Sequence, residues 1–170
     1  MCIRDRTAVE SSLTGHLVLS SLHTNDAASA PIRMIDMGIE PYLISASTVL
    51  VTAQRLVRRL CEHCRTIDEV PADRLVGLDV PEHLLRDGEL TVGRPGGCER
   101  CKGTGYRGRL AVHEVLRFSE SLAETALQRA PTAVLRAQAI EEGMMPLRTA
   151  GMYRVASGET SLDEVLAVTA

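Results

Sequence analysis

The sequence predicts an α/β protein with an inserted four-cysteine zinc element and a small C-terminal helical subdomain. Three observations support this prediction. A nearly continuous apolar run over residues 15–23 is typical of a strand that is covered on both faces. Two Cys-x-x-Cys pairs supply four thiols, the number that a tetrahedral zinc site takes. Helical patterns with caps and glycine stops fill the chain after residue 119.

Length and composition set the outer limits. The chain has 170 residues, enough for one domain or two small ones, and its hydrophobic fraction of 45% is typical of a globular protein. No uncharged apolar run reaches the roughly 18 residues of a membrane span. The start, Met1 to Arg6, is charged and lacks the apolar stretch of a secretory signal, so we expect a cytoplasmic protein.

The basic residues argue against a complete nucleotide site. Arginine accounts for all of them except Lys102. A Walker A loop, Gly-x-x-x-x-Gly-Lys-Ser/Thr, needs a lysine directly after glycine, whereas Lys102 follows Cys101. We therefore expect the chain alone to bind nucleotide poorly. The net charge of −3 and the aromatic content of 2% also predict no nucleic-acid partner.

The first third of the chain contains two histidines of interest. Residues 7–13 are expected to be helical, and residues 15–23 are expected to form a parallel strand that ends at Thr24. Ligands of open α/β sheets bind beyond the carboxyl ends of the strands. This rule places His23 at the ligand edge and His16 about 23 Å away, at the other end of the strand.

Two helices and a strand should follow. Residues 27–37 are predicted to form a helix that ends at Gly38, and a second helix should begin at Pro41. Residues 51–60 are strand-like and carry several arginines. These arginines could face phosphate, a neighbouring subunit or only solvent.

The strongest motif is the cysteine set Cys61, Cys64, Cys98 and Cys101. Without an export signal the thiols should stay reduced, which favours zinc over disulfides. Residues 65–97 separate the two pairs, a longer gap than is usual in compact zinc ribbons, and this favours an inserted knuckle. Prolines and glycines divide residues 65–97 into short pieces, so we expect a structural scaffold whose two ends are held together by the metal.

The cysteine pairs also admit other interpretations. His63, inside the first pair, is expected to be a surface residue because four thiolates already complete a zinc site. A thioredoxin-like redox motif should open a helix in a βαβ unit, which neither pair does. Residues 98–105 resemble one Cys-x-x-Cys-x-Gly-x-Gly repeat of the DnaJ chaperone zinc centre. A stand-alone zinc-binding adaptor or chaperone-like module therefore remains an alternative. His83 and His113 have no role assigned.

The last third should return to the sheet and then become helical. Glycine-rich turns lead into an expected strand over residues 110–116. Ser161 to Glu164 match a capping box at the start of the last helix. Helices are expected over residues 119–130, 132–142, 146–157 and from 161 onward.

Four separated stretches resemble the ATPases that drive type II secretion and type IV pilus assembly. Residues 13–27 resemble their histidine box, and residues 53–61 resemble the segment leading into their four-cysteine zinc element. Residues 97–109 resemble the second half of that element, and Leu147-Arg148 with residues 158–168 match their C-terminal pattern. The resemblance runs, in the right order, over almost the whole chain.

The resemblance implies the C-terminal part of a RecA-like P-loop ATPase domain. Such ATPases are homo-hexamers on the cytoplasmic face of the inner membrane, where they use ATP and Mg²⁺ and act on an inner-membrane platform protein. By resemblance, His23 would approach the γ-phosphate and sense it. His16 would be structural or would support neighbouring catalytic carboxylates.

The chain departs from the family at its start. The family's catalytic glutamate lies in a Gly-Glu-Ile-Arg-Asp stretch, but Ile3-Arg4-Asp5 falls several residues too close to the histidine box. Met1 to Arg6 are therefore expected to lie outside the family sequence, with the Walker A loop and catalytic glutamate upstream. We expect three segments: residues 1–60 as partial ATPase core, 61–109 as zinc element, and 110–170 as returning strand and helical subdomain.

Overall fold

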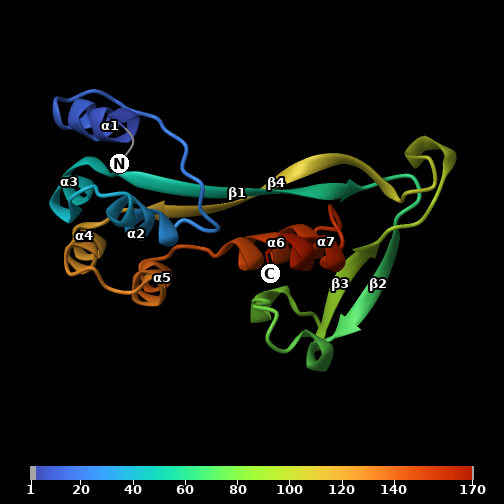
Figure 1. The fold of residues 1–170 in the computed structure, drawn as a ribbon. Coiled ribbons are helices and arrows are strands. Elements are labelled where there is room, and N and C mark those ends of the chain that lie inside the picture. The colour runs from blue at the N-terminus through green and yellow to red at the C-terminus, as the bar shows by residue number, and fades with distance from the viewer. Residues whose placement is uncertain (1–2, 170) are drawn as a thin grey trace. The chain divides into compact units, whose positions relative to one another are not determined.

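A computed structural model describes residues 3–169, with side chains described from residue 6 onward (Figure 1). The chain divides into two compact units: residues 3–53 with 114–145, and residues 54–113 with 146–169. The strands β1 (Leu50–Leu60) and β4 (Tyr106–Arg117) pair as a two-stranded sheet and run through both units. The boundaries of these units differ from those of the three segments expected from the sequence. The assignment of the three segments stays a prediction. No described helix is long and apolar enough to cross a bilayer.

The first unit is a cluster of short helices around an aliphatic core. Its helices are α1 (Ile3–Leu13), α2 (Ser29–Asp36), α3 (Pro41–Ser47), α4 (Glu120–Leu127) and α5 (Thr132–Glu141). Helix α3 packs against α1, α2 and α4, and α5 packs against α2 and α4. The side chains of Ile44, Leu122 and Leu135 are fully buried among them.

Local signals set the ends of these helices as the sequence predicts. Gly38, at φ +86°, follows α2 in the left-handed region that glycine adopts without strain. Pro41 occupies the first turn of α3. The hydroxyl of Ser119 accepts the backbone N–H of Leu122 and caps α4.

The prediction of a strand over residues 15–23 is wrong, because residues 16–24 form neither helix nor strand. Leu17 and Leu19 are 90% and 88% exposed. An apolar run becomes a buried strand only when neighbouring strands and covering layers supply hydrogen bonds and apolar contacts. The described part of the chain brings neither to this segment.

The second unit contains a hairpin and two helices beside the sheet. Strands β2 (Thr66–Pro71) and β3 (Glu89–Arg94) pair antiparallel, from Thr66 opposite Arg94 to Pro71 opposite Glu89. Three short 3₁₀ helices, η1 (Ala72–Leu75), η2 (Glu82–Leu84) and η3 (Glu99–Cys101), lie in the connections, and α6 (Leu147–Ala156) and α7 (Leu162–Val168) complete the unit. Helix α6 packs on both β3 and α7.

The hairpin between the cysteine pairs was not expected from the sequence. Residues 66–69 of β2 are all exposed, so only Val70 shows the apolar side of the strand. The turn between the strands is also far longer than the two-residue loops that signal a hairpin. Only Leu90 and Val92 of β3, both buried, display the alternation of a half-buried strand.

The strands and helices expected after the second cysteine pair are confirmed. Strand β4 covers the expected residues 110–116, and α4 to α7 match the four expected helices to within a few residues. The capping box is formed only in part. Ser161 accepts the backbone N–H of Glu164, but the Glu164 carboxylate binds Arg58 instead.

Candidate metal centre

The four cysteine sulfurs lie in one cluster with the dimensions of a zinc site. The Sγ atoms of Cys61 and Cys98 are 3.9 Å apart, and those of Cys64 and Cys101 are 3.7 Å apart. All four lie within 4.8 Å of one another. A tetrahedron with Zn–S distances of about 2.3 Å has sulfurs about 3.8 Å apart, whereas a disulfide needs about 2.05 Å. The thiols are free, and their spacing fits a metal.

The first knuckle, Cys61–Cys64, is a tight turn at the end of β1. The backbone N–H groups of Cys64 and Arg65 both donate to the Cys61 carbonyl, at 3.2 and 2.9 Å. Cys61 is buried, whereas His63 points outward and contacts Arg100. His63 therefore lies outside the four-sulfur group, as expected of a surface residue.

The second knuckle, Cys98–Cys101, supplies hydrogen bonds to a sulfur. The N–H groups of Cys98 and Gly105 point at the Cys101 Sγ, at 3.3 and 3.2 Å. These contacts, led by that of Cys98, lower the pKa of Cys101 to about 6. Burial first, and then hydrogen bonds with neighbouring thiols, raise the pKa of Cys64 to about 12. Four sulfurs this close can all ionise only with a cation among them, which a zinc ion would supply.

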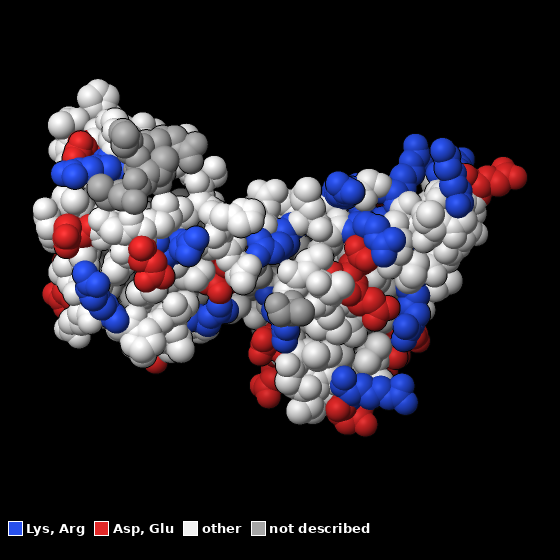
Figure 2. Space-filling model, in the orientation of Figure 1, with Lys and Arg blue, Asp and Glu red and all other residues white. Residues whose placement is uncertain are grey.

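Charged side chains surround the knuckles. Figure 2 shows Lys and Arg side chains gathered where Figure 1 draws the connections from β1 to β2 and from β3 to β4. Arg59 at the end of β1 and Arg100 and Lys102 after β3 are exposed, as are the acidic residues Glu62 and Glu99 of the knuckles. Arg59 also pairs with Glu62 at 2.8 Å, so this arginine has a partner within the chain.

Two glycines allow the knuckles to interlock. The N–H of Cys61 donates to the Gly105 carbonyl at 2.8 Å. A Cβ on Gly96 would lie 2.0 Å from the carbonyl oxygen of Cys64. A Cβ on Gly105 would lie 2.7 Å from the carbonyl oxygen of Gly96, and Gly105 has a φ of +75°. Backbone therefore contacts backbone here, with no room for a side chain.

Gly96→Ala should weaken both the fold and metal binding. The added methyl group must push the first knuckle away, so we expect the free energy of unfolding to fall by about 2 kcal/mol or more and a chelator to remove zinc more readily. Urea unfolding and chelator competition measure the two effects. Gly77→Ala is the control: its Cβ meets nothing within 4 Å, so it costs only the roughly 1 kcal/mol of a left-handed φ. Equal losses in the two variants would contradict the interlocking.

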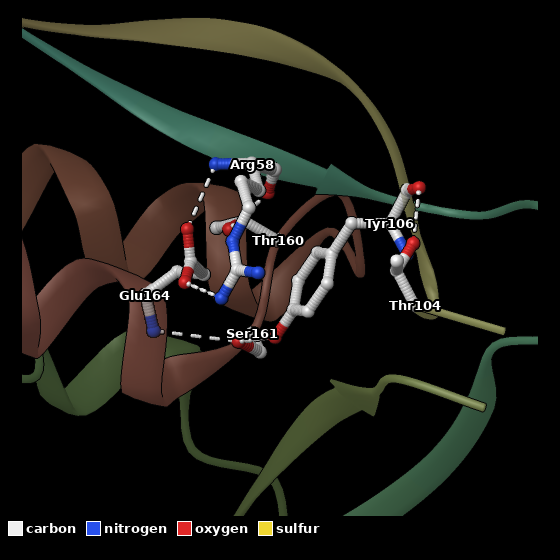
Figure 3. A network of polar contacts seen from close by, with 6 residues as sticks. All are labelled: Arg58, Thr104, Tyr106, Thr160, Ser161 and Glu164. Carbon is white, nitrogen blue, oxygen red and sulfur yellow. Dashed lines mark hydrogen bonds and ion pairs between the residues drawn. The ribbon is translucent and has the colours of Figure 1, made fainter. Parts of the chain in front are cut away.

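A chain of hydrogen bonds leads from the second knuckle to helix α7, and Figure 3 shows its part from Thr104 to Ser161. The Thr104 hydroxyl donates to the Cys101 carbonyl at 2.7 Å and accepts the Tyr106 N–H at 3.3 Å. The Tyr106 hydroxyl lies 2.8 Å from the Ser161 hydroxyl, which caps α7. The metal cluster is thus connected to the C-terminal helices through side chains as well as backbone.

Arg58 of β1 joins the same network. Its guanidinium lies 4.2 Å from the centre of the Tyr106 ring and pairs with the Glu164 carboxylate at 2.5 Å (Figure 3). The Arg58 N–H donates to Glu164 at 3.0 Å, and the Thr160 hydroxyl donates to the Arg58 carbonyl at 2.9 Å. Side chains of the C-terminal segment therefore satisfy backbone groups of β1. The Arg58 guanidinium thus has a partner within the chain.

The Arg58–Glu164 pair should stabilise the fold in a pH-dependent way. The hydrogen bond from the Arg58 guanidinium lowers the pKa of Glu164 below its ordinary value of 4.5. The contribution is therefore present above pH 4.5 and is lost as the pH falls through the lowered pKa. We expect a double-mutant cycle with Arg58→Ala and Glu164→Gln to give a coupling of about 1 kcal/mol at pH 7.

The coupling should weaken as the pH falls below 4.5 through the lowered pKa of Glu164. Chemical unfolding of the four proteins at pH 7 and at a series of pH values down to pH 3 measures it. The exposed helical pair Arg6–Glu10 is the control and should couple by only about 0.3 kcal/mol at pH 7. A coupling between Arg58 and Glu164 that is unchanged at pH 3 would contradict the assignment.

The two predicted histidines lie on an exposed segment. His16 is close to the end of α1, with its Nδ1 atom 3.1 Å from the Thr14 hydroxyl and 3.3 Å from the Ser11 carbonyl. His23 is exposed, and the structure of residues 3–169 shows no hydrogen bond from its side chain. The proposed roles of both histidines stay predictions.

A buried carboxyl group on β4 was not expected from the sequence. Glu114, 1% exposed, lies on β4 between the buried residues Val112 and Leu116. Its Oε1 atom accepts the backbone N–H of Ala27 at 2.7 Å. A signal was present in the sequence: an acidic residue occupies the apolar register of a strand, which requires a buried partner.

A family comparison covers almost the whole chain. Residues 3–167 match the family described as "Type II/IV secretion system protein". The matched range begins at residue 3 and so includes four of the six residues expected to lie outside the family. Met1 and Cys2 are outside the described residues.

Curated relatives are pilus and secretion proteins. The chain is 43% identical to a type IV pilus assembly ATPase PilB of Thermus thermophilus over 96% of the chain and 18% of that relative. It is 44% identical to PilB of Myxococcus xanthus, over 95% of the chain and 28% of the relative. It is also 44% identical to type II secretion system protein E of Aeromonas hydrophila, over 95% of the chain and 31% of the relative. The chain thus spans less than a third of the length of these relatives, and it belongs to the type II/IV secretion system protein family.

Proposed function

We propose that the chain is the C-terminal segment of a hexameric ATPase at the cytoplasmic face of the inner membrane. The ATPase would couple ATP hydrolysis to type II protein secretion or type IV pilus assembly by acting on an inner-membrane platform protein. The observation that carries this proposal is the identity of 43–44% over 95–96% of the chain to two pilus assembly ATPases and a secretion protein E.

The segment would depend on the rest of the motor for chemistry. Its only lysine, Lys102, stands in the second knuckle and not in a phosphate-binding loop. The Walker A loop, the catalytic glutamate and the Mg²⁺ site would come from the part of the relatives that this chain does not match. That part would also contain the nucleotide whose γ-phosphate His23 approaches.

The zinc would be structural. Cys61, Cys64, Cys98 and Cys101 would fill all four positions of a tetrahedral ion, which leaves none for water or substrate. When bound, zinc would supply a fixed crosslink between the two knuckles. Two observations argue against the chaperone-like alternative. The first knuckle lacks the glycines of the DnaJ repeat, and the family match does not favour a chaperone.

Replacement of the matching segment in relatives tests the proposal. In one chimera, this chain replaces the matching 162 residues of the Aeromonas hydrophila secretion protein E, and in another it replaces the matching 163 residues of Myxococcus xanthus PilB. Each chimera is expressed in a strain lacking its own protein. We expect secretion or pilus assembly to be restored in at least one host, and the better host indicates the machine. Two stable chimeras that restore neither would contradict the proposal.

A further inference from the structure

The chain becomes buried immediately after residues 16–25, the histidine segment, which contains His16 and His23. His23 and Asn25 are exposed, whereas Ala27 and Ala28 are both 0% exposed. The transition falls between a segment without regular structure and helix α2. Whatever holds residues 26–28 therefore also sets where the histidine segment ends.

A buried carboxylate holds the first of these positions. Glu114 reaches from β4 and accepts the N–H of Ala27 at 2.7 Å. A buried carboxyl group is costly unless it is hydrogen-bonded, so this site depends on its hydrogen bonds. Ala27 lies 87 residues before Glu114, so this anchor depends on the tertiary fold.

An ion pair holds the preceding residue. The Asp26 carboxylate accepts the Ser29 N–H at 2.8 Å and, through its other oxygen, pairs with Arg136 of α5. The Asp26 side chain is only 15% exposed, which limits screening of the pair by solvent. Two consecutive residues are thus tied to two different elements, β4 and α5.

We infer that Glu114 and Arg136 are positioning residues for His23. The inference rests on the proposed function, in which His23 approaches the γ-phosphate. His23 lies only three positions before Asp26, so its Cα lies within about 11 Å of the Asp26 Cα in any conformation. Fixing Asp26 and Ala27 therefore limits the positions that the imidazole can reach, and loosening them spreads His23 over a larger volume.

The first test measures the anchor in this chain without any activity assay. Hydrogen exchange is followed by NMR at the Ala27 amide in the wild type and in Glu114→Ala. Loss of this buried hydrogen bond is expected to speed local exchange by about 10- to 100-fold. Glu141→Ala, on the exposed face of α5, is the matched control and should leave the rate unchanged. An unchanged rate in Glu114→Ala would overturn the anchor.

The second test asks whether the anchors act through His23. In the Aeromonas chimera, Glu114→Gln and Arg136→Ala should each lower kcat for ATP hydrolysis by about tenfold while KM changes less than about twofold. Arg136→Lys should restore part of the loss because it keeps a cation beside Asp26. Arg136 is partly exposed, so its replacement does not disturb the core.

Combination with His23→Ala decides between positioning and general stability. If the anchors act through His23, adding Glu114→Gln or Arg136→Ala to His23→Ala causes no further loss of kcat. Losses that multiply would overturn the inference. If His23→Ala alone keeps the wild-type rate, the proposed role of His23 fails. In that case, faster exchange at Ala27 in Glu114→Ala would still show a structural anchor, so the two failures are distinguishable.

Discussion

Replacing Cys64 and Cys101 together by serine is expected to abolish zinc binding and unfold the second unit. These two residues come one from each knuckle, so their loss opens the crosslink. Apparent zinc-binding free energies of four-ligand structural sites are about 10–16 kcal/mol at pH 7, which matches or exceeds the whole stability of a typical domain, about 5–15 kcal/mol. Elemental analysis should give about one zinc per wild-type chain. Circular dichroism measures the unfolding.

The fifth cysteine offers a matched control. Cys2→Ser removes a thiol that belongs to neither pair, and it should keep the zinc. A strong chelator added to the wild type should reproduce the unfolding of the double variant. Reduced wild-type protein that is folded but free of zinc would contradict the structural-metal proposal.

His23→Ala in the Aeromonas chimera is expected to lower kcat for ATP hydrolysis by about 10²–10³-fold, the cost of removing one donor that stabilises transition-state charge. The reason is the proposed approach of the imidazole to the γ-phosphate. His16→Ala is the matched comparison, since this residue lies seven positions earlier on the same segment. We expect its effect to stay below about tenfold, as for a supporting residue. Steady-state hydrolysis at saturating ATP measures both variants.

Folding must be separated from chemistry in this comparison. Both histidines are exposed in the isolated chain, so neither replacement should change its melting temperature. The role assigned to His23 would be wrong if its variant hydrolysed ATP at the wild-type rate, or if His16→Ala caused the larger loss.

Elements with strong local signals could be predicted from the sequence. Helix ends followed Ser119, Gly38 and Pro41, whose conformational preferences act within one turn. The cysteine cluster was predicted because each Cys-x-x-Cys pair forms its own tight turn. The structure then brings the two turns together to sulfur distances of 3.7–3.9 Å.

Features that depend on distant partners could not be predicted. Hairpin β2–β3 has little apolar alternation in β2, and its pairing depends on packing of β3 against α6. The anchor of Ala27 joins residues 87 positions apart, which no periodicity reveals. The strand predicted over residues 15–23 is absent for a related reason. The composition of these residues is that of a buried strand, but a strand needs neighbouring strands to pair with.

The most direct test of the central proposal is the rate of ATP hydrolysis by the zinc-loaded Aeromonas chimera, measured beside the isolated 170-residue chain. We predict that the chimera hydrolyses ATP at a rate comparable to the parent secretion protein, whereas the isolated chain shows no hydrolysis. A folded, zinc-loaded chimera without hydrolysis, or an isolated chain that hydrolyses ATP by itself, would contradict the proposal that this chain is the C-terminal segment of a secretion or pilus ATPase.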